Sequence, residues 1–272
     1  MSPTPASPGA AARRDDLRRI PEALAQAGAL RAGYARRDLD VEHKAPGHPV
    51  TEADRAADDL LRRLLPRDGE GWLSEETADH PARLACRRVW VVDPLDGTKE
   101  FVAGVPEWCV SVALVEDGRP VAGGIHNPAA GHTVLGAEGL GVTFDGAPAR
   151  VASPAPGAAP RVLASRSETT RGEWDRWRDA GFEVVPTGSV AYKLALVAAG
   201  RADATWTLTP KCEWDVAAGA ALVAAGGGAV RLPGGEAVRF NQPRPWLPGL
   251  VAASPRLVAE LVERFEKEGV GV

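Results

Sequence analysis

Two aspartates flank a proline and a leucine in the segment Asp93-Pro94-Leu95-Asp96-Gly97-Thr98. Proline fixes its own φ and forces a turn, so both carboxylates can face one point. The Leu95 carbonyl lies between them, and Mg²⁺ prefers such oxygen ligands. Gly97 allows close backbone approach, and a short helix starting at Thr98 would present free N–H groups to a phosphate. The alternative is a surface turn, because Asp, Pro and Gly dominate turns.

Four further acidic residues, at three places in the sequence, could join this pair. Glu75 and Glu76 are adjacent, a pattern that usually marks a solvated loop. Asp215 begins a segment of small residues, where a helix cap or a dipole partner is the routine explanation of a lone acid. Asp54 follows Thr51 by three positions and could be the acid of a capping box. Each is weak evidence alone, but carboxylates that converge in one cleft cannot all stay ionised without cations.

The order of these elements resembles the signature of the inositol monophosphatase superfamily. Asp54, Glu75-Glu76, DPLDGT and Trp214-Asp215 followed by Gly227-Gly228 occur in that order between about Val50 and Gly228. The resemblance implies an α/β (α+β) fold, a layered α-β-α-β-α sandwich. It implies two or three Mg²⁺ ions as cofactors, with these ligands: Glu75, Asp93, the Leu95 carbonyl, Asp96 and Asp215. The implied catalytic group is Asp54, Thr98 and Glu75, in which Thr98 and Asp54 orient the attacking water and help deprotonate it.

The residue inventory favours direct attack by water on a phosphate ester. Two cations about 3.5–4 Å apart would polarise phosphoryl oxygens, lower the pKa of a bound water and stabilise the leaving alkoxide. No Ser-His-Asp or Cys-His arrangement is evident, and the five His residues lack ligand spacing. A phosphoenzyme formed on Asp93 or Asp96 is the minor alternative.

The substrate is expected to be a small phosphorylated metabolite. DGTKEF at residues 96–101, Ser165-Arg166-Ser167 and Lys193 resemble the 3′(2′),5′-bisphosphate nucleotidases, which act on 3′-phosphoadenosine 5′-phosphate, and Lys193 and Arg166 would neutralise a second phosphate. Inositol monophosphatases carry an acidic residue before the Trp-Asp pair, and residues 206–210 (WTLTP) contain none. The expected substrate-binding residues are Gly97, Thr98, Lys99, Ser165, Gly188, Ser189 and Lys193.

Alternatives to this interpretation remain. Lys99 and Lys193 could be solvated surface charges, and Lys211-Cys212-Glu213 has no explanation from the sequence. An inositol-1-monophosphatase or broad sugar phosphatase is the alternative enzyme, and a non-catalytic metal- or nucleotide-binding regulator is the alternative from another class. The resemblance also implies inhibition by Li⁺ and a homodimer.

The acidic motifs require helices and strands to bring them together. Apolar periodicity predicts helices at Arg13–Tyr34 and from Thr51 to Leu65, and a β-branched run predicts a strand at Arg88–Asp93 that ends at Pro94. An antiparallel meander is predicted at residues 108–116, 120–127 and 133–137. The Pro- and Gly-rich stretch at 153–160 predicts a boundary between an N-terminal α+β subdomain (1–152), carrying most metal ligands, and a C-terminal α/β subdomain (153–272), carrying Asp215 and substrate contacts. In the second subdomain, strands near Val162, Val184, Ala204 and Val251 should alternate with helices at 170–180, 190–199, 214–225 and 255–267.

Composition narrows the classes of function. The 272 residues are 44% hydrophobic and 25% charged, with a formal net charge of -4, as is ordinary for a globular protein. The chain has no basic block that could follow a nucleic-acid backbone, and its longest weakly polar stretch, Val216–Val230, is too short for a membrane span. Three cysteines without CxxC spacing argue against a disulfide framework and a zinc cluster, which favours a reducing cytoplasm.

Overall fold

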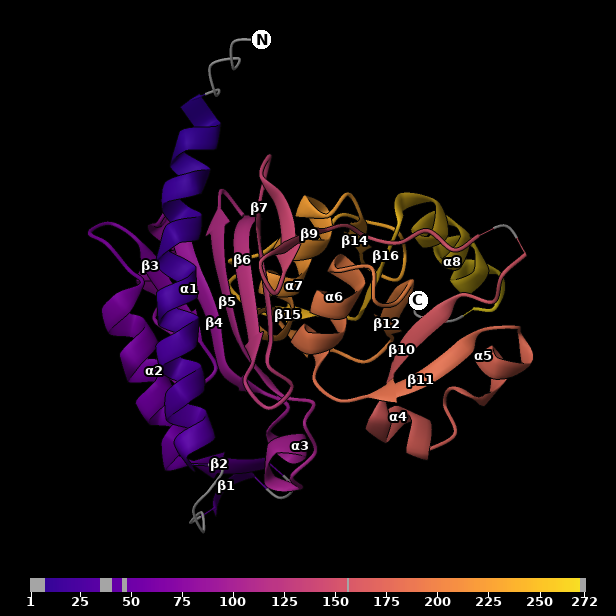
Figure 1. Ribbon diagram of the computed structural model, residues 1–272, viewed down its shortest axis with the longest axis horizontal. Helices are drawn as coiled ribbons and strands as arrows, with labels where there is room; N and C mark the ends of the chain where they lie inside the picture. Colours follow the sequence, from indigo (N-terminus) through magenta and orange to yellow (C-terminus); the bar gives the residue numbers. More distant parts are fainter. Residues whose placement is uncertain (1–7, 35–40, 46–47, 156, 270–272) are drawn as a thin grey trace.

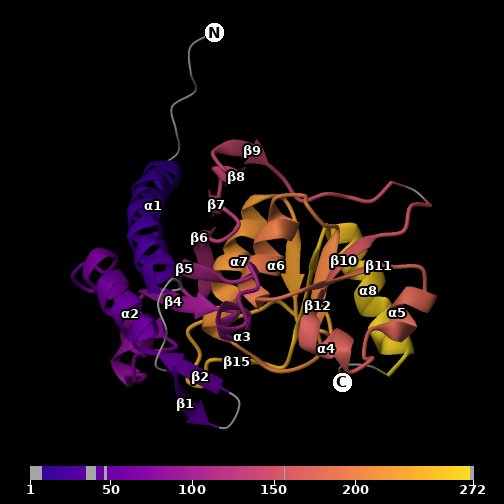
Figure 2. The ribbon, with the colours of Figure 1, turned by 60° about the horizontal axis from the view of Figure 1, so that its bottom comes forward.

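Helices and sheets alternate in five layers (Figure 1). The computed structural model describes residues 8–34, 41–45, 48–155 and 157–269, with the backbone alone at 8–10, 34, 41–45 and 48–51. Helices α1 (Pro8–Tyr34) and α2 (Glu52–Leu64) cover the first sheet, and α6 (Val190–Ala198) and α7 (Glu213–Ala225) lie between the two sheets (Figure 2). The outer layer consists of α4 (Arg166–Thr170), α5 (Asp175–Asp179) and α8 (Pro255–Lys267). This is the layered α-β-α-β-α sandwich that the resemblance implied.

The first sheet has seven strands in the order β3-β4-β5-β6-β7-β8-β9. Strand β3 is parallel to β4, and all other neighbours are antiparallel, so the predicted meander is confirmed. The strands are β3 (Gly71–Ser74), β4 (Arg88–Asp96), β5 (Cys109–Glu116), β6 (Arg119–Asn127), β7 (His132–Ala137), β8 (Gly141–Phe144) and β9 (Ala147–Ala149). A hairpin of β1 (Val41–Ala45) and β2 (His48–Thr51) lies between α1 and α2 in the sequence. The expected N-cap side chain of Thr51 lies outside the described residues.

The second sheet has five strands in the order β11-β10-β12-β16-β14. Its strands are β10 (Arg161–Ser165), β11 (Glu183–Thr187), β12 (Ala204–Thr207), β14 (Ala229–Arg231) and β16 (Leu250–Ala253). All four strands predicted in this half are present, and a further short pair, β13 (Lys211–Cys212) and β15 (Trp246–Leu247), lies outside this sheet. The helix predicted at 170–180 is wrong in its extent. Within this segment only Thr170, the last residue of α4, and α5 are helical, and the turn between them contains Gly172 with φ +77°, a conformation that an α-helix does not accommodate.

Strand β4 carries the key acids and is buried on both faces. Val89 and Val91 belong to the hydrophobic cluster on the α6–α7 side, whereas Trp90 and Val92 belong to the cluster under α1 and α2. A strand covered on both faces reads as a continuous apolar run, as this one does. The expectation that it ends at Pro94 is wrong: β4 continues to Asp96, with a register shift against β5 between Asp93 and Asp96. Such a bulge tolerates a residue without an N–H.

The change of sheet falls near the expected boundary between residues 152 and 153. One cluster of buried side chains nevertheless contains residues from both sides, among them Val91, Ala113, Leu194 and Leu222. The division into two subdomains therefore stays a prediction.

In the described part of the chain, no helix is long and apolar enough to cross a membrane. No disulfide joins the cysteines, all of which are described.

Candidate active site

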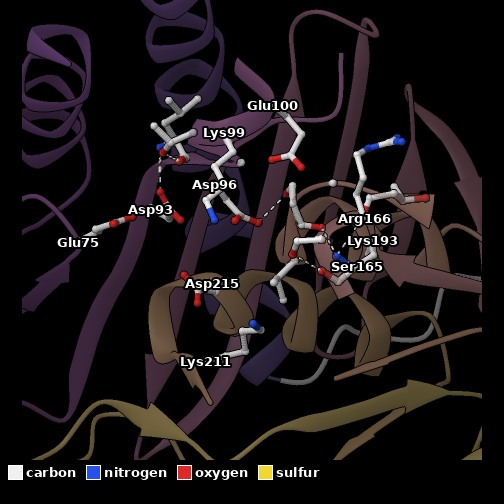
Figure 3. Close-up of a pocket in the computed structure, with 18 of the residues that line it drawn as sticks. Glu75, Asp93, Asp96, Lys99, Glu100, Ser165, Arg166, Lys193, Lys211 and Asp215 are labelled. Atoms are coloured by element: carbon white, nitrogen blue, oxygen red, sulfur yellow. Dashed lines mark hydrogen bonds between the residues drawn. The ribbon is translucent and has the colours of Figure 1, made fainter. Parts of the chain in front are cut away.

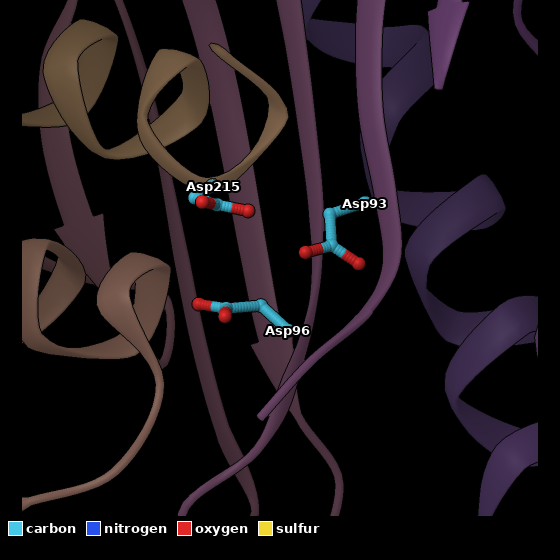
Figure 4. A group of neighbouring side chains, drawn as sticks. All are labelled: Asp93, Asp96 and Asp215. Carbon is cyan, nitrogen blue, oxygen red and sulfur yellow. The ribbon is translucent and has the colours of Figure 1, made fainter. Parts of the chain in front are cut away.

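Three carboxylates converge between the first sheet and α7 (Figure 4). One oxygen atom from each of Asp93, Asp96 and Asp215 lies within 4.8 Å of the others. Asp93 is in β4, Asp96 is its last residue, and Asp215 is in the first turn of α7. The fold therefore brings together the three aspartates that were predicted to bind metal, two from β4 and one from α7.

The three carboxylates destabilise one another when they are charged. Burial, followed by the charges of Glu75, Asp96 and Asp215, raises the pKa of Asp93 well above its usual value. Burial and the charges of Asp96 and Glu75 likewise raise the pKa of Asp215 well above its usual value. The pKa of Asp96 is raised by burial, which hydrogen bonds partly oppose. A cation at this point would relieve the repulsion and restore the charged forms.

Hydrogen bonds from the start of α6 hold Asp96 in place (Figure 3). The Ser189 hydroxyl donates to Asp96 Oδ2 at 2.6 Å, and the Ala191 N–H donates to the same oxygen at 2.5 Å. Ser189 also caps α6, because its Oγ accepts the Tyr192 N–H at 2.9 Å. Ser189 has φ 58°, an uncommon backbone conformation for a residue with a side chain. This left-handed turn lets one residue cap the helix and bind Asp96.

Asp93 and Asp215 are each fixed by a neighbouring backbone N–H. Asp93 Oδ1 accepts the Leu95 N–H at 2.8 Å, and Asp215 Oδ2 accepts the Cys212 N–H at 3.0 Å. The second bond is part of a capping box at the start of α7. Asp215 therefore caps the helix and also belongs to the acidic group.

The predicted short helix begins at Thr98. Helix α3 (Thr98–Val102) is preceded by Gly97 with φ +96°, and a Cβ on Gly97 would lie 2.9 Å from the Glu107 carbonyl oxygen. Only glycine fits this turn without strain. Thr98 Oγ1 donates to the Leu95 carbonyl at 3.2 Å. The hydroxyl and the predicted carbonyl ligand are therefore direct neighbours.

Glu75 and Asp54 are not part of this convergent group. Glu75 follows β3 in an exposed loop and lines the same cavity as the three aspartates, although it is outside the group whose oxygens converge. Asp54 is buried in the first turn of α2, and its Oδ1 lies 2.6 Å from Arg31 Nη1. The predicted roles of Glu75 as a ligand and of Asp54 as the partner of Thr98 stay predictions.

A cavity of about 310 Å³ opens beside the carboxylates (Figure 3). All seven residues predicted to bind substrate line it: Gly97, Thr98, Lys99, Ser165, Gly188, Ser189 and Lys193. Lys193 is buried, and its Nζ donates to the carbonyls of Ser189 at 2.9 Å and Thr187 at 3.3 Å. Burial lowers its pKa, while the charge of Asp96 acts in the opposite direction.

Arg166, which was expected to neutralise a second phosphate, forms an ion pair with Glu107. Its Nη2 lies 2.6 Å from Glu107 Oε2, and the same carboxylate oxygen accepts the Gly188 N–H at 2.6 Å. Arg166 lines the cavity, but part of its charge is already balanced by Glu107. A role in neutralising a second phosphate would therefore depend more on the lysines than on Arg166.

Two charged residues near the site were not predicted from the sequence. Lys211 lines the cavity, and its Nζ donates to Thr209 Oγ1 at 3.1 Å. Arg31 is fully buried, with its guanidinium carbon 4.5 Å from the centre of the Phe101 ring. A signal for Arg31 was present, because it continues the helical stripe of Ile20, Leu24 and Ala27, which are all buried.

Comparisons with known proteins agree with this arrangement. The model of the inositol monophosphatase family matches residues 14–269. An inositol-1-monophosphatase of Mesorhizobium japonicum is 36% identical over 214 residues, which are 75% of this chain and 80% of the relative. A histidinol-phosphatase of Chlorobaculum parvum is 34% identical over 224 residues, which are 78% of this chain and 84% of the relative. The crystal structure of CysQ from Bacteroides thetaiotaomicron superposes with a TM-score of 0.76 at 28% identity, covering 88% of this chain and 97% of that one. The ordered acidic motifs, the layered fold and these matches agree, and the chain belongs to the inositol monophosphatase family.

Proposed function

We propose that this chain is a Mg²⁺-dependent phosphatase that hydrolyses small phosphate monoesters by direct attack of water. The observation that carries the proposal is the convergence of Asp93, Asp96 and Asp215 within 4.8 Å of one another. Their raised pKa values indicate a site that is complete only with positive charge present. An all-oxygen donor set of this kind suits Mg²⁺ better than softer metals.

The residues that would hold the cations are the three aspartates, the Leu95 carbonyl and Glu75, for two or three ions. When bound, Mg²⁺ supplies polarisation of the phosphoryl oxygens and a water of lowered pKa. Thr98 would orient the attacking water, and the Asp54 carboxylate would accept its proton. The Thr98 hydroxyl donates to the Leu95 carbonyl, which places it beside one of the proposed ligands. Ser189 and Ala191 hold the Asp96 carboxylate in one orientation throughout.

The proposed substrate is 3′-phosphoadenosine 5′-phosphate. Lys99, Lys193 and Lys211 line the cavity and would attract a ligand that carries a second phosphate. In the region where inositol monophosphatases carry an acidic residue, this chain has Thr207 and Thr209. Their hydroxyls donate to Glu168 at 2.8 and 3.2 Å. These threonines line a separate cavity of about 360 Å³. Inositol 1-phosphate is the alternative substrate, because the relative from Mesorhizobium japonicum is named for it.

A substrate panel with Mg²⁺ titration tests the proposal. Phosphate release would be compared for 3′-phosphoadenosine 5′-phosphate, inositol 1-phosphate and histidinol phosphate under equal conditions. We expect release that depends on Mg²⁺, is abolished by EDTA and is fastest with the nucleotide. Much faster turnover of inositol 1-phosphate would refute the nucleotide preference, and release that persists in EDTA would refute the metal site.

A matched pair of variants controls for general effects of charge removal. Asp96→Asn should lower turnover by about 100-fold or more, because it removes a charge that organises the reacting groups. Asp117→Asn removes an exposed charge in the β5–β6 turn and should leave turnover unchanged. Equal activities of the two variants would refute the role of Asp96.

The proposed setting is the cytoplasm, which three unpaired thiols favour.

A further inference from the structure

Two buried charges outside the acidic group take no part in the proposed reaction. Glu213 is 0% exposed and lies in the first turn of α7, as does Asp215. Arg83 is 3% exposed and lies in a 3₁₀ helix (Pro81–Ala85) that follows the loop carrying Glu75. Buried charges are costly unless they are fully paired. Their partners therefore indicate what each charge holds in place.

Glu213 binds two successive backbone N–H groups. Its Oε2 accepts the Asn241 N–H at 2.6 Å, and its Oε1 accepts the Gln242 N–H at 2.9 Å. Its own N–H donates to the Pro245 carbonyl at 2.9 Å. The first turn of α7 is thus fastened to the segment 241–245 by three hydrogen bonds. This accounts for the one residue of the unexplained Lys211-Cys212-Glu213 sequence that is completely buried.

Arg83 binds the same two residues from the opposite direction. Its Nη1 donates to Asn241 Oδ1 at 2.7 Å, and its Nη2 donates to the Gln242 carbonyl at 2.9 Å. The Asn241 side-chain amide returns a hydrogen bond to the Arg83 carbonyl at 3.2 Å. Asn241 has φ 58°, a conformation that asparagine adopts more readily than most residues. The dipeptide Asn241-Gln242 is therefore held between Arg83 and Glu213.

The Arg83 end of this connection extends to the loop that carries Glu75. Arg83 Nε and Nη2 donate to the two carboxylate oxygens of Asp79 at 2.6 and 2.8 Å. Earlier in the loop, the hydroxyls of Ser74 and Thr77 both donate to Asp58 on α2. Fixed contacts thus secure the loop on both sides of Glu75, which is itself exposed.

We propose that Arg83, Asn241, Gln242 and Glu213 form a clamp that positions Glu75 relative to Asp215 and thereby sets the affinity for Mg²⁺. Asp93 and Asp96 share one strand, so the sheet fixes their spacing. Glu75 and Asp215 come from two other elements, and the clamp connects those elements through hydrogen bonds of 2.6–3.2 Å. Groups that orient ligands in this way commonly change metal affinity 10- to 100-fold when they are mutated. The inference rests on the proposed Mg²⁺ site.

Two variants weaken the clamp without touching a predicted ligand. Glu213→Gln keeps the side-chain shape but replaces one acceptor with an NH₂ group that faces a backbone N–H. Asn241→Gly removes both side-chain contacts with Arg83 and suits φ 58°, which makes it the milder variant should Glu213→Gln fold poorly. Arg88→Met is the matched control, because it removes partly buried ion pairs with Asp16, Glu70 and Glu116 near the far end of β4.

Two readouts separate positioning from general stability. One is the Mg²⁺ concentration for half-maximal phosphate release, and the other is the rise in Tm that Mg²⁺ produces over EDTA. We expect both clamp variants to need about tenfold more Mg²⁺ and to show a smaller Mg²⁺-induced rise in Tm. Arg88→Met should lower Tm in EDTA while its Mg²⁺ requirement stays within twofold of wild type.

The measurements distinguish failure of the clamp from failure of the proposed function. Clamp variants that lose Tm but keep the wild-type Mg²⁺ requirement would overturn the clamp and leave the metal site standing. A wild-type protein with no Mg²⁺ response in either readout would instead overturn the proposed function. In the combination of Arg83→Met with Glu213→Gln, the two effects on the logarithm of the Mg²⁺ requirement should be less than additive, since both act on one dipeptide. Full additivity would also overturn the clamp.

Discussion

Replacing Asp93 by Asn should stabilise the metal-free protein while it destroys Mg²⁺ binding. Asp93 is 1% exposed and lies within 4.8 Å of two other carboxylates, measured between their nearest ligand oxygens. Two unit charges at that distance repel by about 3.5 kcal/mol at an effective dielectric constant of about 20. Protonation already relieves part of this repulsion, because the pKa of Asp93 is raised. We therefore expect a net gain in unfolding free energy of about 1–3 kcal/mol in EDTA.

The dependence on pH gives this prediction a second signature. Asp93 binds its proton more tightly in the folded chain than in the unfolded chain, because burial and its acidic neighbours raise its pKa from the ordinary 3.8. Metal-free wild type should therefore lose stability as the pH rises from near 3.8 through the raised pKa. Asp93→Asn removes one of the groups responsible, so its stability should fall less over the same range.

Thermal unfolding from pH 4 to 8, in EDTA and in Mg²⁺, measures both effects. At about 2–4 °C per kcal/mol for a chain of this size, Asp93→Asn should raise Tm in EDTA by roughly 2–12 °C near neutral pH. Mg²⁺ should raise Tm of the wild type and leave the variant unchanged. The reasoning is refuted if the variant is less stable than wild type in EDTA at neutral pH, or if Mg²⁺ stabilises both equally.

Three further predictions concern the surroundings of the acidic group. Arg31→Met should cost about 3–5 kcal/mol of unfolding free energy in urea titrations, because it removes the guanidinium from a buried ion pair, and adding Asp54→Asn should recover part of the loss; no recovery would contradict the pairing. Gly97→Ala should cost about 1–3 kcal/mol, since φ is +96° there, and should reduce kcat; a variant with wild-type Tm and kcat would show that the turn adapts. Lys211→Met should raise KM for 3′-phosphoadenosine 5′-phosphate by about tenfold, which corresponds to about 1.4 kcal/mol, and should leave KM for a monophosphate unchanged; equal changes in both would argue against a contact with the second phosphate.

The sequence predicted best where one local pattern had one structural solution. The run RRVWVVD gave β4 because it is apolar on both faces, and α7 followed from its small residues after Trp214-Asp215. The three aspartates could be assigned together because their motif order matches a family. The helix predicted at 170–180 was too long, because it was extended through the turn at Gly172. Short strands such as β8 and β9 were missed because their pairing depends on neighbours rather than on their own residues.

The residues that the sequence could not assign are those whose role depends on a distant partner. Glu213 had no explanation from the sequence, and its partners are the backbone N–H groups of Asn241 and Gln242. Arg83 was not singled out from the sequence, although it is only 3% exposed. Such contacts have no periodicity and no fixed spacing, so only the folded chain reveals them.

Two buried cations, one on α1 and one on α6, act on the acidic group. On the α1 side Arg31 lies 2.6 Å from Asp54, and the charge of Asp93 also acts on it. On the α6 side Lys193 is buried, and the charge of Asp96 opposes the lowering of its pKa. These cations balance part of the negative charge without occupying the point where Asp93, Asp96 and Asp215 converge, because both are bonded elsewhere. The remaining imbalance is reflected in the raised pKa values of the three aspartates, and it would favour the divalent cation that we propose for this point.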